Sequence, residues 1–551
     1  MSHYTLIPYK SVTDTIGYCW KPEHYGKGYD AQVSPRIQYL DEYLVEIEAK
    51  TVIIEHEYVD RNFIDDYCGY YARSFRDYPK KCERLLLFKS IFSEDELKNA
   101  ILDADGVELQ GIKESFLGYI VLRPIPGAHL GRVCLATYPP ENGKNRKFPL
   151  CKSYHAHFMG MTFTVKSIAF QEQDNIISAC ATSALWSAFH CIKGNEPADV
   201  PSPYNITNLA KQVFVETIPT NVIEKGLLPP QMSAVISSNG LLPLLAGYDS
   251  KSMLKALTRA YMNVGLPLIL GVTLAYEDEE KARRNSVNPV IGNHAVTITG
   301  YRLADKLIPA AFSDNRPCSD PRNQEVEELY LLSSGIDKFY AHDDQIGPFA
   351  SMDDRSEYWM RLETRWNYYK NKTEKVDATV DIILIPCFNK IRVRFPLVLN
   401  LISRCNVIFA PVWRFFHKKL IWDAKLYCVN DFKEAIANRE LYAGLDDRLR
   451  LDILSESLPR YLWVVDSSIV ENDVLEPIAT FFFDATDMES SDYFILGIHH
   501  RQDSYDLYSG LFGEWSELEF ETYINSQTKN KAVLTSIITS YRDNNTKKIR
   551  R

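Results

Sequence analysis

Hydrophobic and polar positions along the 551-residue chain switch between helical and strand-like spacing, which predicts a protein with both helices and strands. A helix is predicted directly after residue 180, because apolar residues there repeat with helical period on one face. These residues are Ala181, Ala184, Leu185, Ala188, Phe189 and Ile192. A second helix is predicted over residues 252–264, where Gly265 ends the pattern.

The region after the second helix is predicted to be rich in strands. The polar stretch 276–288 indicates a loop, and Gly292-Asn293 indicates a turn before His294. His294 then begins a segment of alternating apolar and polar residues. Strands are predicted over residues 266–274, from 294 onward, over 328–332 and over 338–342.

Elements of both kinds are also predicted on either side of this region, so the expected fold class is α+β. Strands are expected at Thr51–His56, Phe116–Arg123, Val380–Ile385, Tyr461–Val465, Ile478–Phe483 and Tyr493–Ile498. Helices are expected after Asp60 as a capping residue, at Lys433–Ile436 and at Asp446–Ser455.

Length predicts two to four domains, at roughly 100–200 residues per domain. Three regions and a connector are expected. They are an N-terminal α+β domain at 1–160 with a regulatory role, a domain at 161–355, a helical linker at 356–375, and a C-terminal α+β domain at 376–551 whose role is unknown.

One apolar segment, Phe395 to Phe416, approaches the length of a membrane span. It contains Asn400, Arg404 and Asn406, which are costly at the centre of a bilayer. A buried or interfacial amphipathic helix is therefore expected, and no membrane span.

Composition narrows the class of protein further. Hydrophobic residues make up 46% and charged residues 24%, which is typical of a globular chain. The net charge of −10 argues against general nucleic-acid binding. The eleven cysteines are scattered without CxxC spacing, and residues 1–10 lack the apolar stretch of a signal peptide. Both observations predict a reduced, cytoplasmic protein.

Cys180 stands at the start of the first predicted helix, which suggests a nucleophile. The positive end of a helix dipole and a nearby imidazolium both favour the thiolate, the reactive form of the side chain. The small residues Ala179, Ala181 and Ser183 leave the thiol approachable. A structural cysteine is the alternative, and is the commoner case for a cysteine taken alone.

His294 and the acidic pair Asp343-Asp344 supply the other groups that such a nucleophile needs. His294 is expected at the mouth of a strand, and the aspartates follow the next strands along the chain. We expect Asp343 to orient the imidazole, with Asp344 as the alternative, because alternation along a strand lets only one of them face His294. A surface histidine and a solvated turn acid are the other interpretations.

The stretch from Met161 to Met352 resembles the papain-like cysteine peptidases, and is most similar to the bacteriocin-processing (double-glycine) group. Members carry a glutamine, a cysteine before a helix rich in Ala and Leu, a His-Ala-Val strand, and an aspartate after the next strand. The matching positions are Gln173, Cys180, His294 and Asp343. The family usually has glycine where this chain has Ala181, and one residue fewer between the glutamine and the cysteine.

The resemblance implies a core in which a helix packs on an antiparallel sheet, and a peptidase that cleaves peptide or amide bonds with a Cys-His-Asp triad. Gln173 would stabilise the oxyanion, and no metal or organic cofactor is needed. The substrate would be a protein or peptide, and the flanking domains would control access or bind a regulatory protein partner, as in a bacterial stress or defence effector. The alternatives are an inactive papain-like binding module and an acyl or amide transferase with the same Cys-His-Asp order.

Overall fold

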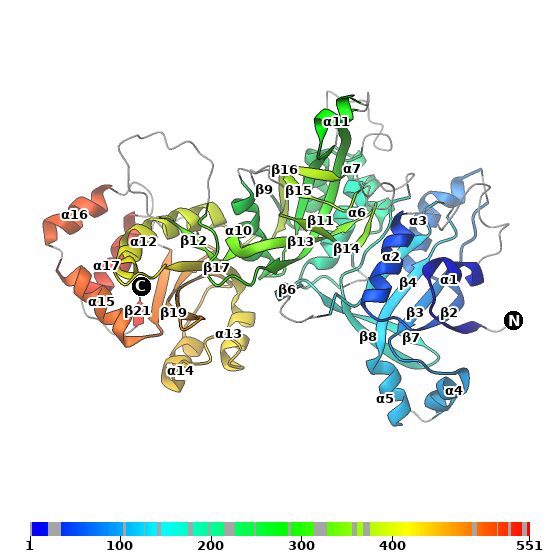
Figure 1. The fold of residues 1–551 in the computed structure, drawn as a ribbon, viewed down its shortest axis with the longest axis horizontal. Helices are drawn as coiled ribbons and strands as arrows, with labels where there is room; N and C mark the ends of the chain where they lie inside the picture. The colour runs from blue at the N-terminus through cyan, green and yellow to red at the C-terminus, as the bar shows by residue number, and fades with distance from the viewer. Residues whose placement is uncertain are drawn as a thin grey trace. The chain divides into compact units, whose positions relative to one another are not determined.

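The computed structural model is of the α+β class that the sequence predicts (Figure 1). It describes residues 3–19, 35–75, 77–102, 106–125, 127–139, 145–174, 180–196, 199–213, 226–246, 250–284, 288–312, 328–354, 361–366, 375–487, 493–514, 516–526, 531–542 and 548–550. The chain forms two compact units. Unit 1 comprises Met1–Gly247, Gly265–Arg302 and Asp337–Pro386, and unit 2 comprises Tyr248–Val264, Leu303–Ile336 and Cys387–Arg551.

Unit 1 therefore contains residues from the predicted N-terminal domain and from the predicted central domain. Its first part is an antiparallel sheet in the order β1-β2-β3-β4-β5. The strands are β1 (Tyr4–Pro8), β2 (Thr51–Tyr58), β3 (Cys82–Phe88), β4 (Phe116–Leu122) and β5 (Leu130–Leu135). The helices are α1 (Val12–Cys19), α2 (Pro35–Glu46), α3 (Arg61–Gly69), α4 (Glu94–Leu102) and α5 (Val107–Glu114). The predicted strands at 51 and 116 are confirmed, as is the cap of α3, where Asp60 accepts a hydrogen bond from the Phe63 amide.

A separate hairpin, β7 (Lys152–Phe158) and β8 (Met161–Ser167), packs against β4 and β5. Its residues alternate strictly between buried and exposed, which is the pattern of a sheet with one face in the core. The chain then runs from β8 into the segment that precedes Cys180.

The second sheet of unit 1 closes on itself. Its strands follow the order β10-β11-β13-β14-β15-β16, and β16 also pairs with β10, so six strands form a closed circuit. Closure of this kind leaves no open edge among these strands. The strands are β10 (Leu268–Tyr276), β11 (Val290–Leu303), β13 (Ile336–Asp343), β14 (Gly347–Asp353), β15 (Arg361–Glu363) and β16 (Val376–Cys387), with β6 (Asn145–Lys147) beside β11 and β9 (Leu242–Ala246) beside β16. The predicted strands at 266–274, 294, 338–342 and 380–385 are confirmed.

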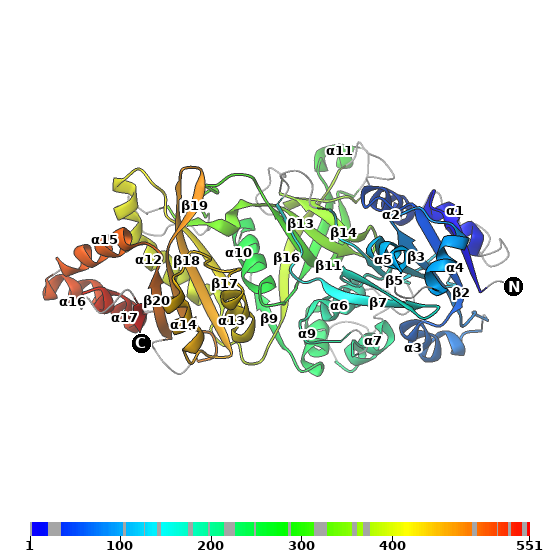
Figure 2. The ribbon, with the colours of Figure 1, turned by 90° about the horizontal axis from the view of Figure 1, so that it is seen from below.

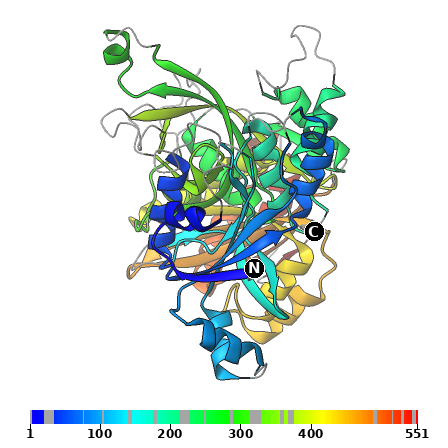
Figure 3. The same ribbon diagram turned by 90° about the vertical axis from the view of Figure 1, so that its right-hand side faces the viewer.

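Two local predictions in this region are wrong. The polar stretch after β10 contains a short helix, α11 (Glu279–Arg284), rather than only a loop. Gly292-Asn293 is not a turn, because β11 already begins at Val290 and Asn293 pairs with Thr273. The register shifts between Leu274 and Ala275, so that one residue of β11, Ile291, has no partner on β10. His294 consequently lies inside a strand. Figure 3 shows the green strands β10 and β11 running together to α11.

The expected helical linker at 356–375 is also corrected. Arg361–Glu363 form strand β15, which pairs with β16. Residues 355–360 and 367–374 lie outside the described residues. Local charge and aromatic content favoured a helix here, whereas pairing with a distant strand decides the conformation.

Between β8 and β9 the chain forms the helices α6 (Cys180–Cys191), α7 (Pro203–Lys211) and α9 (Pro229–Ser238). The predicted helix after residue 180 is confirmed as α6, and every residue in it is buried except Cys180, which is half-buried. Helix α6 packs against β10 and α7.

Unit 2 is built on a sheet of its own, in the order β12-β17-β18-β19-β20-β21. Figure 2 labels its four central strands, β17 to β20. Its strands are β12 (Tyr330–Leu331), β17 (Ile421–Cys428), β18 (Tyr461–Glu471), β19 (Val474–Asp484), β20 (Phe494–His499) and β21 (Lys548–Arg550). Its helices are α10 (Lys251–Met262), α12 (Phe395–Phe415), α13 (Val429–Ala437), α14 (Asp447–Ser455), α15 (Gln502–Gly513), α16 (Glu517–Ser526) and α17 (Lys531–Arg542). The predicted strands and helices of the C-terminal region are confirmed, and the predicted helix at 252–264 is α10.

Helix α10 belongs to unit 2 although its sequence lies between segments of unit 1. It packs on β17, where the Arg259 guanidinium donates to both carboxylate oxygens of Asp423, at 2.5 and 2.7 Å. Asn263 also donates a hydrogen bond to the Leu426 carbonyl. These partly buried polar contacts fix α10 against a strand that lies 164 residues later.

Within the described ranges, α12 is the one helix whose length and composition would allow it to cross a membrane, and 56% of its most apolar window is buried inside the protein. Asn406 is buried on this helix and accepts a hydrogen bond from the Trp422 indole. Such contacts are those of a helix packed in a core.

Candidate functional site

The candidate site lies in unit 1, where α6 meets the closed sheet. Cys180 is the first residue of α6, which confirms its predicted position in the first helical turn. His294 comes from β11, and Asp343 ends the neighbouring strand β13, also as predicted. The structure thus brings the start of α6 to two residues that lie more than 100 positions later in the chain.

A hydrogen bond fastens β11 to α6. The Thr297 hydroxyl donates to the Ala184 carbonyl at 2.6 Å, and both groups are buried. Thr297 lies three residues after His294, and Ala184 lies one helical turn after Cys180. This bond therefore holds the strand that carries the imidazole against the helix that carries the thiol.

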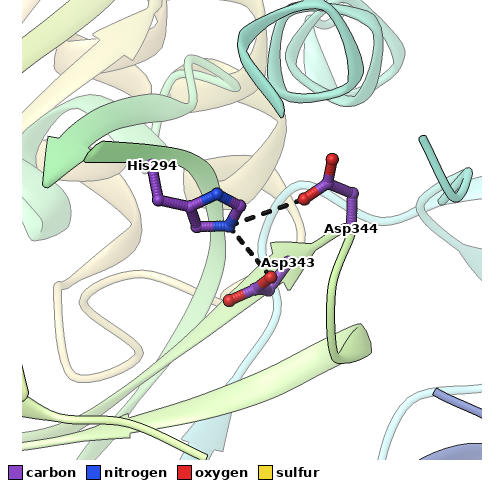
Figure 4. A group of neighbouring side chains, drawn as sticks. All are labelled: His294, Asp343 and Asp344. Atoms are coloured by element: carbon purple, nitrogen blue, oxygen red, sulfur yellow. Dashed lines mark hydrogen bonds and ion pairs between the residues drawn. The ribbon is translucent and has the colours of Figure 1, made fainter. Parts of the chain in front are cut away.

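The imidazole of His294 lies between the thiol and the carboxylates. Cys180 is near enough to His294 to help raise the pKa of the imidazole. On the other side, His294 Nε2 donates to Asp343 Oδ1 at 3.0 Å and lies 3.5 Å from Asp344 Oδ1 (Figure 4). Because Nε2 faces the carboxylates, Nδ1 is the ring nitrogen that remains for the thiol.

Both aspartates face His294, so the expectation that only one of them could do so is wrong. Asp343 is the last residue of β13, and Asp344 begins the turn that leads to β14. Strand alternation stops where the strand ends, and the turn brings the second carboxylate back to the same imidazole. Among the described residues, neither oxygen of Asp344 has a hydrogen-bond partner.

Asp343 is held by three donors. In addition to His294, the Gln345 amide donates to Oδ1 at 3.0 Å, and the Trp366 indole donates to Oδ2 at 2.8 Å. The Trp366 ring also meets the imidazole edge-on, with 5.0 Å between ring centroids. Trp366 follows β15 and therefore contacts both partners of the His294–Asp343 bond.

Burial and charge act in opposite directions on the site's ionisable groups. Burial disfavours the charged imidazole, but the Asp343 carboxylate, the hydrogen bond that His294 donates to it and the nearby Cys180 thiol outweigh burial, so the pKa of His294 is raised well above its usual range. Burial likewise opposes the charge of Asp343, yet His294, Trp366 and the Gln345 amide lower its pKa. The pKa of Asp344 is raised to about 7, chiefly by burial. One aspartate is therefore a stable anion and the other titrates near neutral pH.

The segment before Cys180 is anchored on both sides of Gln173. Glu172 is buried, pairs with Arg36 of α2, and accepts a hydrogen bond from the Leu130 amide at 2.9 Å. Asp174 is buried and accepts a hydrogen bond from the Tyr71 hydroxyl at 2.6 Å. Gln173 between them is half-buried, and residues 175–179 lie outside the described residues.

Arg36 connects this segment to the turn that contains Asp344 and Gln345. Its guanidinium pairs with Glu172 and also donates to the side-chain oxygen of Gln345 at 2.7 Å. Sequence reasoning missed Arg36, Glu172 and Trp366. Nothing in the local pattern around these residues indicates a site. The roles of Arg36 and Glu172 depend on a contact between segments more than 100 residues apart. The role of Trp366 depends on strand β15, in a segment that had been expected to be helical.

Comparison with protein-family models and with curated proteins finds no match to the chain.

Proposed function

We propose that the protein is a cysteine peptidase of papain-like type, with Cys180 as nucleophile, His294 as general base and acid, and Asp343 as the residue that orients His294. The observation that carries the proposal is the 3.0 Å hydrogen bond between His294 and Asp343 beside a cysteine that begins a buried helix. A buried helix that begins at the cysteine and a closed sheet that carries the other two residues are consistent with a papain-like core.

The reaction begins with an ion pair. In this pair the proton of Cys180 resides on His294, whose raised pKa favours the imidazolium. The thiolate attacks the carbonyl carbon of a peptide bond, and His294 then gives its Nδ1 proton to the departing amine. Water, deprotonated by His294, hydrolyses the acyl-enzyme and restores the thiol.

The proposal assigns supporting roles to two further residues. Gln173, together with the Cys180 backbone N–H, donates to the oxyanion of the tetrahedral intermediate, because anchored neighbours hold its segment before the helix. Trp366 keeps water from the His294–Asp343 bond and holds the carboxylate in place. No step requires a metal or an organic cofactor.

We further propose a cytoplasmic setting, a protein or peptide substrate, and a regulatory role for parts of the chain outside the site. All ten described cysteines are free, which is consistent with a reducing compartment.

The test is to map new protein N-termini in cells that make the wild-type chain, Cys180→Ala or Cys68→Ala. Cys68 is an exposed thiol on α3 and serves as the matched control. New N-termini should appear with the wild type and with Cys68→Ala and be absent with Cys180→Ala. Equal N-terminal profiles from all three would contradict the peptidase. Acyl transfer products, seen by mass, would identify the transferase alternative instead.

A further inference from the structure

We propose that His294, Asp343 and Asp344 form a binding site for a divalent transition-metal ion of the Zn²⁺ class. The site lies on the side of the imidazole opposite Cys180, and the bound ion holds the peptidase inactive. The binding claim depends on these three residues alone, whereas the inhibitory consequence rests on the proposed peptidase function.

The first observation is the unsatisfied carboxylate of Asp344. Its side chain is 3% exposed, and neither oxygen has a hydrogen-bond partner among the described residues. Figure 4 shows this carboxylate pointing at His294 Nε2 from the turn after β13. A buried carboxylate without a hydrogen-bond partner is costly, and a cation between it and its neighbours would remove that cost.

The second observation is the spacing of the three ligand atoms. Nε2 lies 3.0 Å from Asp343 Oδ1 and 3.5 Å from Asp344 Oδ1, and all three atoms lie within 4.8 Å of one another. Zinc bonds of ~2.0–2.1 Å at tetrahedral angles place neighbouring ligands about 3.3 Å apart. The observed separations lie on both sides of this value, so small side-chain movements would complete three corners of a tetrahedron and leave the fourth for water.

The surroundings of Asp343 also suit a metal ligand. The Trp366 indole and the Gln345 amide already hold its two oxygens, as outer hydrogen bonds hold metal-bound carboxylates. One imidazole and two carboxylates favour a zinc-like ion over Mg²⁺, which prefers oxygen ligands and six-fold coordination.

Occupancy of the site would change what His294 can do. The ion replaces the proton on Nε2, which leaves to solvent, and the neutral ring then carries its remaining proton on Nδ1. A ring in this state faces Cys180 with an N–H donor and has no free nitrogen to accept the thiol proton. The thiolate–imidazolium pair cannot form, so the ion acts as an inhibitor and removal by a chelator restores the pair.

Zinc binding should be measured on the full chain carrying Cys180→Ala, by competition with a chromophoric chelator at neutral pH. This variant keeps the three proposed ligands and has no peptidase chemistry, so its result does not depend on the proposed function. We expect one tight site per chain. Asp344→Asn in the same background should weaken binding at least 10-fold, since loss of an outer partner alone costs 10–100-fold. The control Asp353→Asn removes a carboxylate at the opposite end of the β13–β14 hairpin and should leave the affinity unchanged.

X-ray absorption of zinc bound to the wild-type chain gives a second readout that needs no variant. The spectrum should contain nitrogen and oxygen ligands only. A sulfur ligand near ~2.3 Å would assign the ion to Cys180 and overturn the proposal. Absence of a tight site, or equal affinities for Asp344→Asn and Asp353→Asn, would also overturn it, whatever the outcome of the peptidase assays.

Discussion

The Trp366 indole N–H donates a 2.8 Å hydrogen bond to the carboxylate oxygen of Asp343 that His294 leaves free. One carboxylate is thereby fixed from two directions, and its anionic form is favoured. The relationship has a measurable consequence because a phenylalanine at position 366 would keep most of the ring and lose the donor.

Trp366→Phe should lower the free energy of unfolding by about 1.5 kcal/mol, the lower end for a hydrogen bond to a charged group, because Trp366 is half-buried. Loss of the donor raises the pKa of Asp343 and weakens its support of the charged imidazole. The alkaline limit of activity should therefore move to lower pH. Urea unfolding and a pH–rate profile measure the two effects, and an unchanged profile would restrict Trp366 to a packing role.

Cys180 should react with iodoacetamide before the other cysteines at pH 7, because it is half-buried at the start of α6 and His294 can take the proton of its thiol. Cys68 is more exposed and provides the internal reference for simple accessibility. His294→Ala should slow the labelling of Cys180 and leave that of Cys68 unchanged. Mass spectrometry of timed samples gives both rates, and faster labelling of Cys68 in the wild type would count against a reactive thiolate.

Asp343→Asn should reduce turnover by about two to four orders of magnitude while the fold is retained, because an amide neither fixes the productive tautomer nor supports the imidazolium. Asp344→Asn should be mild by comparison, since its oxygen lies 3.5 Å from Nε2 against 3.0 Å for Asp343. Both variants should be assayed with a chelator present. Full activity in both would leave a Cys180–His294 dyad as the better description.

Asp344→Asn should also stabilise the fold in a pH-dependent way. The folded-state pKa of about 7 lies above the usual 3.8, so between these values the folded chain binds more protons and its stability falls as pH rises. The amide cannot ionise and avoids this loss. We expect a gain at pH 8 over pH 4 of at most roughly 4 kcal/mol, measured by chemical denaturation in chelator. A constant difference across this range would show that Asp344 does not titrate as described.

Arg259→Met should destabilise unit 2 by about 3 kcal/mol, because Asp423 would lose its bidentate partner in a buried site. Lys425 remains 3.0 Å from Asp423, which places the effect at the lower end for a broken buried pair. Arg259 lowers the pKa of Asp423 despite burial, so this contribution is present at neutral pH and is lost in acid below the usual range of an aspartate. Equal stability of variant and wild type at pH 7 would refute the assignment.

Sequence reasoning identified the residues whose signal is local. Cys180 precedes a helical pattern and His294 lies in an alternating strand, and both elements are present in the structure. The turn before His294 was wrong because glycine and asparagine are common in turns, whereas here they are paired in a strand with β10.

Features that depend on distant pairing could not be predicted. Strand β16 was expected in a separate C-terminal module, yet it closes the sheet by pairing with β10, as in the register Ile269 to Leu384. Asp344 was expected to turn away from His294 because the end of β13 could be located only to within a residue or two. The sequence around Trp366 did not indicate its contact with Asp343, because that contact depends on the position of strand β15.

The place of α10 in the fold has a consequence for synthesis of the protein. Arg259 emerges from the ribosome 164 residues before Asp423, its partner on β17. Because synthesis adds ~5–20 residues per second, roughly 8–33 s pass between the synthesis of the helix and that of the strand. During this interval the apolar side of α10, which includes Met253, Leu254 and Leu257, has no strand to cover it. The nascent chain therefore exposes an apolar helix while unit 1 is still incomplete, and its yield in cells should depend on chaperones that bind such helices.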